Sequence, residues 1–180
     1  MTTPMPPDTA RIVVGEQVLR ATVTELGARI AEDYSGEDLR LITVLKGGLF
    51  FITDLCRAIP MPLSIDFVSV QPYARGAAGV VRLTKDLSDD IEGASVLLIE
   101  DVIDTGLTSN YVLTLLRSHR PKRLDVCALL DKPARRIANV PVTYRGLEMP
   151  DEFLIGYGLD LNGLYRNLPY VAALPDEAVF

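Results

Sequence analysis

The chain has 180 residues, of which 48% are hydrophobic and 23% charged, as expected for one globular domain with a sizeable buried core. Its formal net charge of -6 argues against nucleic acid as the main partner, because phosphate backbones are bound by clustered Lys and Arg side chains. A single histidine, His119, makes a Cys/His zinc site close to excluded, and no apolar stretch is long enough to span a membrane.

The first residues and the two cysteines set expectations about location. Residues 1–10 lack the cationic region and the apolar run of a signal peptide, and we expect them to be disordered. Cys56 and Cys127 each lie in an apolar segment, where a free buried thiol is the expected state. Without a disulfide framework, the reducing cytoplasm is the expected compartment.

The apolar pattern predicts helices and strands that alternate along one continuous domain, residues 1–180. In chain order we expect a helix at 15–34, a strand at 39–45, a helix at 47–59, a strand at 63–70, a β-like run at 80–84, a strand at 95–100, a helix at 108–117 and a strand at 123–130. Near-continuous apolar strands that alternate with helices predict an α/β fold, in which helices cover both faces of a parallel sheet. Such sheets bind ligands beyond the carboxyl ends of their strands.

The stretch LLIEDVIDTGLTSNY, residues 97–111, carries the strongest functional pattern. An apolar run leads through Thr105, Gly106, Leu107 and Thr108 into a predicted helix. Amides at a helix N-terminus bind phosphate, a glycine lets the backbone approach the ligand, and the two threonine hydroxyls add donors. The sequence therefore predicts a phosphate site at this loop.

Three carboxylates, Glu100, Asp101 and Asp104, crowd the entrance to the same loop, although carboxylates repel phosphate. Adjacent Glu100 and Asp101 only accept hydrogen bonds and suit the two hydroxyls of a ribose diol, directly or through a hydrated Mg²⁺. Phosphate on one side and a diol on the other predict a ribose 5-phosphate group. In the alternative interpretation, Asp101 and Asp104 merely cap the following helix. Three carboxylates beside T-G-L-T at the end of an apolar strand favour the ligand.

The segment VLLIEDVIDTGLT resembles the phosphoribosyl-diphosphate-binding motif of the type I phosphoribosyltransferases. From about Val13 to Leu174 the chain resembles the bacterial hypoxanthine-guanine phosphoribosyltransferases in particular, because further motifs follow in the family's order. These motifs are VLKGGLFF, SIDFVSV, LTKDLSDDIEG, LLDKPARR, EMPDEFLIGYGLD and YRNLPY. The resemblance implies a small hood beside the sheet, supplied here by residues 15–34 and 141–174.

For the phosphoribosyl group, the resemblance implies that Asp104 is the base and acid at purine N7, while Glu100 and Asp101 hold the ribose hydroxyls and Mg²⁺. The chemistry agrees with these roles. Displacement of diphosphate from the anomeric carbon builds an oxocarbenium-like cation, which nearby carboxylates stabilise, and Mg²⁺ neutralises the departing diphosphate.

The diphosphate itself is assigned by resemblance to the Leu45-Lys46-Gly47 turn and to Arg166. In the family this turn binds through its backbone, often with a strained or cis peptide before the lysine. Asp160 is expected near the magnesium and its diphosphate, as a third metal residue beside Glu100 and Asp101. Without the resemblance, Arg166 would be interpreted as a solvated surface side chain, and the Lys-Gly turn would leave function and ordinary surface equally open.

The purine is assigned by resemblance to Lys132, which would bind the 6-oxo group, and to Phe153 and Leu154. Phe153 would stack on the base and Leu154 would offer backbone contacts to its edge. Lysine carries donors and no acceptor, so it favours an oxo group over an amino group. From sequence alone, Lys132 could equally be solvated, and Phe153 and Leu154 could be simple core residues.

One segment departs from the family. QPYARGAAG, residues 71–79, stands where a longer mobile loop with Ser-Tyr near its start is expected, and here Pro72 replaces the serine while Tyr73 remains. A lid of this kind excludes water when it closes. The departure therefore leaves lid closure, and the reaction rate that depends on it, unpredicted by the resemblance.

The resulting expectation is a transferase that converts hypoxanthine or guanine and phosphoribosyl diphosphate to IMP or GMP and diphosphate, with Mg²⁺ as cofactor. A homodimer or homotetramer is expected, with no nucleic acid or membrane partner. Two alternatives stay open, a phosphoribosyltransferase for another base such as a pyrimidine, and a regulatory nucleotide-binding protein that retains the fold. The preference among hypoxanthine, guanine and xanthine is not fixed by the sequence.

Overall fold

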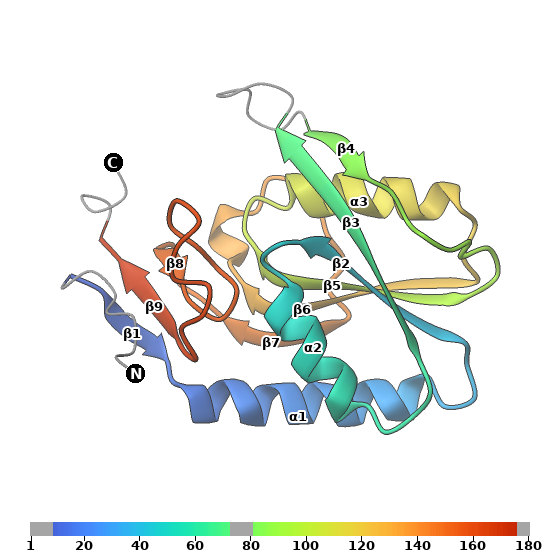
Figure 1. Cartoon of the computed structure of the whole chain (residues 1–180), viewed down its shortest axis with the longest axis horizontal. Coiled ribbons are helices and arrows are strands. Elements are labelled where there is room, and N and C mark those ends of the chain that lie inside the picture. Colours follow the sequence, from blue (N-terminus) through green and yellow to red (C-terminus); the bar gives the residue numbers. More distant parts are fainter. Residues whose placement is uncertain (1–8, 73–80, 176–180) are drawn as a thin grey trace.

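Two β-sheets organise the protein in the computed structural model, which describes residues 9–72 and 81–175 (Figure 1). In chain order the elements are β1 Arg11–Val14, α1 Glu16–Asp33, β2 Leu39–Leu45, α2 Leu49–Ala58, β3 Ser64–Pro72, β4 Val81–Lys85, β5 Ser95–Ile103, α3 Leu107–Ser118, β6 Arg123–Asp131, a 3₁₀ turn Pro133–Arg135, β7 Tyr144–Glu148, β8 Phe153–Ile155 and β9 Val171–Leu174. The predicted helices and strands are all present, with ends shifted by a few residues.

The main sheet has the strand order β4-β3-β2-β5-β6-β7. Strands β3, β2, β5, β6 and β7 are parallel, whereas β4 runs antiparallel to β3, so the sheet is mixed rather than wholly parallel. Only residues 73–80 separate β3 from β4, which is too few for the crossover that a parallel pair needs. The antiparallel edge therefore follows from the length of the connection.

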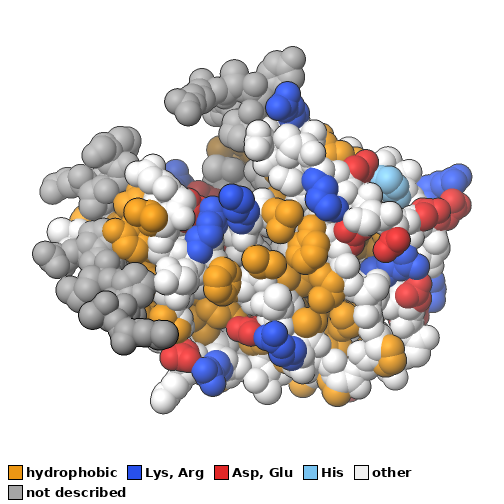
Figure 2. Space-filling model, viewed as in Figure 1, with side chains coloured by type: hydrophobic (Ala, Val, Ile, Leu, Met, Phe, Trp, Pro, Cys, Tyr) orange, Lys and Arg blue, Asp and Glu red, His pale blue; other side chains and the backbone are white. Residues whose placement is uncertain are grey.

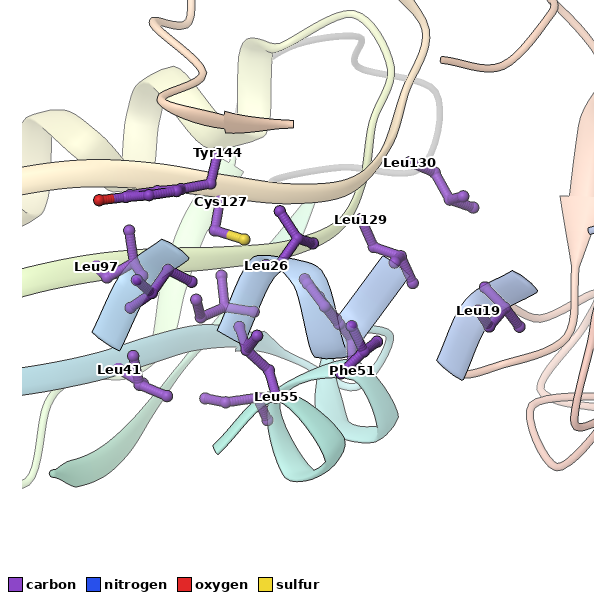
Figure 3. Packing of buried hydrophobic residues seen from close by; sticks show 14 of the residues in the cluster. Leu19, Leu26, Leu41, Phe51, Leu55, Leu97, Cys127, Leu129, Leu130 and Tyr144 are labelled. Carbon is purple, nitrogen blue, oxygen red and sulfur yellow. The ribbon is translucent and has the colours of Figure 1, made fainter. Parts of the chain in front are cut away.

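Helices cover both faces of the main sheet, as the sequence predicts. One apolar layer joins α1 and α2 to β2, β5 and β6, and Figure 3 shows Leu26, Leu55 and Leu97 meeting within it. A second layer joins α3 to the opposite face, where Leu98 and Val126 pack against Leu113. With apolar layers on both faces, the carboxyl ends of the central strands are the polar edge at which a ligand can bind.

Helix α1 packs closely against α2. Its buried side chains Leu19, Val23, Leu26 and Ile30 recur at helical spacing, and Gly27 lies so near α2 that a Cβ there would overlap Ala58. This contact fixes α2 on the sheet. The turn that precedes α2 is therefore fixed as well.

The hood is a separate three-stranded antiparallel sheet in the order β1-β9-β8, seen beside the main sheet in Figure 1. The hood was expected to include residues 15–34 and 141–174, which is more of the chain than this sheet contains. Helix α1 belongs to the core layer and β7 to the main sheet, and the short strand β1 before the helix enters the hood instead. The buried side chains of α1 pack into that core layer, which explains its place.

Several expectations concern residues that the structure does not describe. The expectation of disorder for residues 1–10 concerns mainly residues 1–8, which lie outside the described ranges. The lid residue Tyr73 also lies outside them. Cys56 and Cys127 are free thiols, as predicted. None of the helices within residues 9–72 and 81–175 has the length and apolar character needed to cross a bilayer.

Candidate active site

Strand β5 carries the acidic residues to the carboxyl edge of the sheet. It runs to Ile103, three residues beyond its predicted end, so Asp101 lies inside the strand rather than after it, beside Glu100, the last residue of the predicted strand. Glu100 is buried and Asp101 is half-buried. Pairing with both β2 and β6 holds the strand in place, so the two carboxylates sit on a rigid support.

The loop after β5 turns directly into α3 and borders a cavity of about 220 Å³. Gly106 is the N-cap of α3 with φ of 79°, a left-handed conformation that favours glycine, and a Cβ there would overlap the carbonyl of Ala138. The first amides of a helix have no carbonyl partner within it and can bind an anion, although in α3 the Leu107 amide donates to the Thr105 hydroxyl at 3.4 Å. Thr105, Thr108 and Ser109 also line the cavity. The loop predicted to bind phosphate thus borders a cavity.

The carboxylates of this cavity are held in a poorly solvated place. Burial, together with the neighbouring charge of Asp101 and against a hydrogen bond with Ser109 that lowers it, raises the pKa of Glu100 from its ordinary 4.5 to about 8. Burial likewise raises the pKa of Asp101 to about 6. Atom Oε1 of Glu100 is buried without a hydrogen-bond partner among the described residues. An unpartnered buried carboxylate oxygen indicates that a ligand group or cation completes the site.

A second cavity, of about 340 Å³, adjoins the first. Both cavities are lined by Gly47, Asp101, Val102 and Asp104, which form their common wall. The remaining lining of the second cavity consists of Lys132, Arg135, Phe153, Leu154, Leu159, Asp160 and Arg166. The structure therefore brings the predicted base and diphosphate residues together on the far side of the carboxylates from the phosphate loop.

Lys132 follows β6 directly and is buried, so its ammonium group reaches the cavity from the sheet edge. Its Nζ donates a hydrogen bond of 2.5 Å to the carbonyl oxygen of Glu152, and burial lowers the pKa of the lysine. Phe153 and Leu154 lie on the hood strand β8 beyond it, with Phe153 partly exposed and Leu154 buried. An aromatic ring and a cation thus share one small cavity.

Asp104 lies on the common wall and is joined by a residue that sequence reasoning missed. The Arg135 Nε atom is 3.2 Å from Asp104 Oδ1, and Nη1 of the same guanidinium is 3.3 Å from Asp151. The Arg135 contact to Asp104 is an ion pair without hydrogen-bond geometry, because Asp104 Oδ1 has no hydrogen-bond partner among the described residues. One arginine therefore spans the base cavity, from the phosphate loop to the residues before β8.

The diphosphate candidates lie where the hood meets the turn before α2. Arg166 Nη2 is 2.6 Å from Asp160, and Nη1 donates a hydrogen bond of 2.6 Å to the carbonyl oxygen of Gly158. Gly158 comes so close to Gly47 that a Cβ on Gly158 would overlap the Gly47 carbonyl. This contact places Arg166 and Asp160 beside the turn.

The turn itself has the cis Leu45–Lys46 peptide that the family resemblance suggests. Gly47 lies against Asp101 so closely that a Cβ would overlap the carboxylate. The Lys46 side chain is exposed and lines neither cavity, whereas its neighbours Leu45 and Gly47 do. The turn therefore borders the cavities through Leu45 and Gly47 rather than through the lysine ammonium.

The acidic groups suit a cation that is shared with a substrate. Residues 9–72 and 81–175 contain no cluster of three or more Asp, Glu, His or Cys side chains that would hold a metal alone. Mg²⁺ is usually bound by one or two carboxylates together with water and substrate phosphates. The unpartnered Glu100 oxygen and the adjacent Asp101 fit such a shared site.

Comparison with known proteins agrees with this geometry. The phosphoribosyl transferase domain family matches residues 15–162. The hypoxanthine-guanine phosphoribosyltransferase of Mycobacterium avium is 43% identical over 177 residues, which cover 94% of this chain and 87% of that protein. The chain belongs to the hypoxanthine-guanine phosphoribosyltransferase family.

Solved structures of the same family superpose closely on this phosphoribosyltransferase. A hypoxanthine phosphoribosyltransferase from Staphylococcus aureus gives a TM-score of 0.93 at 41% identity, covering 100% of this chain and 99% of that one. The Trypanosoma cruzi enzyme, solved in complex with the product IMP, gives a TM-score of 0.89 at 37% identity and covers 97% and 99% of the two chains. The fold and the family are thereby shown.

Some lining residues of the phosphoribosyltransferase were not predicted. Ser109 is buried in the first turn of α3, and its position beside T-G-L-T was the signal that could have found it. Arg135 stands in the quoted motif LLDKPARR, but nothing in its spacing relates it to Asp104. Leu107, which was predicted, begins α3 and does not line the phosphate cavity.

Proposed function

We propose that this phosphoribosyltransferase transfers the 5-phosphoribosyl group of phosphoribosyl diphosphate to hypoxanthine or guanine, forming IMP or GMP and releasing diphosphate. One observation carries the proposal: the two cavities meet at the wall that contains Asp101 and Asp104. A nucleotide has a phosphate at one end, a base at the other and a ribose between them. The same order is found here, from the α3 amides through the carboxylates to Lys132 and Phe153.

On the phosphoribosyl side, the amides and hydroxyls from Thr105 to Ser109 would bind the 5′-phosphate. Glu100 and Asp101 would accept the hydrogen bonds of the ribose hydroxyls. When the bond from the anomeric carbon to diphosphate breaks, positive charge develops on the sugar. The same two carboxylates lie in a poorly solvated cavity, where they stabilise that charge more strongly than they would in water.

On the base side, Phe153 would stack on the purine and Leu154 would present its backbone to the edge of the ring. Lys132 would donate to the 6-oxo group. Its Nζ now donates to the Glu152 carbonyl, which shows that the ammonium is directed by backbone rather than free in solvent. A 6-amino group would bring donor against donor, so adenine is disfavoured.

Asp104 is the group proposed to move a proton at purine N7. It borders both cavities, which a residue between the base and the ribose must do. The attacking base nitrogen becomes more nucleophilic as a carboxylate accepts the N7 proton, and the carboxylic acid can return it in the reverse direction. Arg135, at 3.2 Å, would hold the carboxylate until the base takes its place.

Mg²⁺ is proposed as the cofactor, held through Glu100, Asp101 and Asp160 together with the substrate. When bound, it would neutralise charge on the departing diphosphate. The chain's own residues would keep that diphosphate in place, through the backbone of Lys46 and Gly47 and the guanidinium of Arg166. The Arg166–Asp160 pair at 2.6 Å would then open or shift to share its charges with the ligand.

A radiolabelled-base panel tests the proposal. The purified protein is supplied with phosphoribosyl diphosphate and Mg²⁺ and with hypoxanthine, guanine, xanthine, adenine or uracil in turn. Labelled IMP and GMP are the expected main products. Nucleotide from uracil alone would instead support a pyrimidine enzyme, and no nucleotide from any base would support a regulatory role.

The regulatory alternative receives little support from the surface. On the face shown in Figure 2, Lys and Arg side chains alternate with Asp, Glu and apolar side chains and form no continuous basic area. An RNA-binding or DNA-binding face would concentrate positive charge. The expected homodimer or homotetramer, and the cytoplasmic location, stay predictions that light scattering and cell fractionation would test.

A further inference from the structure

A buried carboxylate that lines neither cavity, and takes no part in the proposed chemistry, lies at the end of β6. Asp131 ends β6, immediately before Lys132, and its side chain is almost fully buried. It is paired with two arginines, Arg136 through Oδ1 and Arg145 through Oδ2 at 2.7 Å. Burying a carboxylate is unfavourable unless it is well paired, so the cluster invites a functional explanation.

Arg136 connects this carboxylate to the phosphate loop. Its Nε donates a hydrogen bond of 3.2 Å to the carbonyl oxygen of Asp104, while Nη2 donates to Asp131. The next two residues continue the contact, because the amides of Ile137 and Ala138 donate to the carbonyl oxygen of Thr105 at 2.8 and 3.0 Å. Segment 136–138 therefore packs against the loop and lines neither cavity.

The loop leaves no room to move toward that segment. A Cβ at Gly106 would meet the Arg136 side chain and the Ala138 carbonyl. Since Gly106 sets the direction of the first α3 amides, a shift of Arg136 would change the position of the phosphate site and of Asp104 together.

Arg145 provides the contrast. It makes an ion pair without hydrogen-bond geometry to the other oxygen of the same carboxylate, but it lies on β7, and among residues 9–72 and 81–175 it makes no hydrogen bond or ion pair with the phosphate loop. Its side chain is 50% exposed, against 17% for Arg136. Two arginines thus share one buried partner, and one of them also contacts the loop.

We propose that Arg136, anchored by Asp131, is a positioning residue that fixes the phosphate loop and the Asp104 backbone for the phosphoribosyl group. The inference rests on the proposed function in that this loop takes the 5′-phosphate. Arginine suits the role because its planar fork donates to two acceptors in fixed directions. A lysine can neutralise Asp131 but carries no second donor at the position of Nε.

Three variants test the inference: Arg136→Lys, Arg136→Gln and the matched control Arg145→Gln. Steady-state kinetics would give KM for phosphoribosyl diphosphate and for hypoxanthine, and thermal unfolding would report stability. We expect both Arg136 variants to raise KM for phosphoribosyl diphosphate roughly tenfold, the loss expected for one hydrogen bond made by a charged group. KM for hypoxanthine should change less than about threefold.

The unfolding temperatures should group the three variants in a different way from the KM values. Arg136→Gln and Arg145→Gln each remove one charge from Asp131 and should lower the unfolding temperature, whereas Arg136→Lys keeps the charge and should stay near the wild type. If Arg136→Gln does not fold, the comparison of Arg136→Lys with Arg145→Gln still decides. Arg136→Lys with a wild-type KM for phosphoribosyl diphosphate, or Arg145→Gln with an equally raised KM, would overturn the positioning role.

Calorimetry with ribose 5-phosphate keeps this test independent of turnover. Weaker binding to Arg136→Lys than to Arg145→Gln supports the inference even if the wild type converts no purine, a result that would refute the proposed function alone. Equal affinities for the two variants would overturn the inference while leaving the enzyme assignment intact.

Discussion

The phosphate cavity takes most of its lining from the single segment 100–109, whereas the base cavity adds, to the wall that the two cavities share, residues from segments at 132–135, 153–160 and 166. In the first, one strand, one loop and one helix set the geometry, so neighbouring residues in the sequence are neighbours in the site. In the second, contacts such as that of Lys132 with Glu152 must hold the end of β6 to the segment before β8, and the pair of Arg166 with Asp160 must hold the segment between β8 and β9. The phosphate cavity thus depends on local chain geometry, whereas the base cavity depends on tertiary packing.

This difference in construction predicts a different role for each of the two cavities, called here the phosphate half and the base half. The phosphate half is rigid because β5 lies between two parallel neighbours, and it carries buried carboxylates whose solvation is poor. The base half depends on the placement of a small separate sheet. Substitutions in the first should therefore change phosphoribosyl binding and chemistry, and substitutions in the second should change the choice of base.

Asp104→Asn would affect both halves, because Asp104 borders both cavities. We expect kcat to fall by roughly 10²- to 10⁴-fold, the range for loss of a general acid or base, while phosphoribosyl diphosphate still binds. Stopped-time assays with hypoxanthine and calorimetry with phosphoribosyl diphosphate would measure the two effects. Turnover within about threefold of the wild type would remove Asp104 from the proton-transfer role.

Lys132→Ala should act on the base half alone. The wild type should use adenine with kcat/KM at least about a hundredfold below that for hypoxanthine, since adenine leaves the buried donors of Lys132 unpaired. The variant should lose most of this preference, mainly by losing hypoxanthine. A competition between the two bases at fixed phosphoribosyl diphosphate and Mg²⁺ measures it.

Lys122→Ala is the matched control, because Lys122 pairs with Glu37 and precedes β6, at the opposite edge of the sheet. Its base preference should equal that of the wild type. Adenine turnover within about tenfold of hypoxanthine in the wild type would contradict both the assignment of Lys132 and the 6-oxopurine substrate class.

Glu100→Gln combined with Asp101→Asn should act on the phosphoribosyl half. Removing both charges should weaken phosphoribosyl diphosphate with Mg²⁺ by roughly ten- to a hundredfold, while hypoxanthine alone changes little, since only the former brings hydroxyls and a cation. Calorimetry with each ligand separately measures this, with exposed Glu92→Gln as the control. Equal losses for the two ligands would mean that the pair supports the fold instead.

Glu100→Gln alone should show the smallest effect, on stability in a chelator-treated sample. The pKa of Glu100 is raised to about 8 in the folded protein from an ordinary 4.5. The unfolded chain therefore releases this proton first, and wild-type stability falls as pH rises from about 4.5 to about 8. We expect the variant to be more stable by about 1–3 kcal/mol at pH above about 8, and the gap to close toward pH about 4.5.

Urea denaturation of both proteins at several pH values measures that gap. A constant difference across the range would show that the carboxyl titrates normally. A carboxylate that lowers the stability of the free protein, and is kept nonetheless, would mark the phosphate half as the part shaped by function.

The same contrast explains what the sequence predicts. The strands of the main sheet up to β6 are apolar runs bounded by polar turns, and the loop at 105–108 has the composition of an anion site, so both could be predicted from local chemistry. Strands β1, β8 and β9 have three or four residues each and become strands only by pairing with one another. The hood could therefore not be delimited beforehand.

Contacts between side chains were still harder to predict from the sequence. Lys132, Phe153, Leu154, Asp160 and Arg166 were assigned through family resemblance, and the structure gathers them in one cavity, which leaves their individual roles as predictions. Arg135 and Asp131 were missed, because an arginine or aspartate at a strand end is ordinarily solvated. What makes them notable is proximity in space, to Asp104 and to Arg136 respectively.

The pairing of β1 with β9 has a consequence for how the protein is made. Arg11 lies opposite Ala173, so the first strand of the hood must wait for the last one, while the phosphate loop is complete once β6 and residues 136–138 have been added. If the phosphate loop folds before the last strand has left the ribosome, the nascent protein passes through a stage with a phosphate loop and an unfinished base site. A ribosome-arrested chain ending before β9 should then bind ribose 5-phosphate, yet fail to retain a purine.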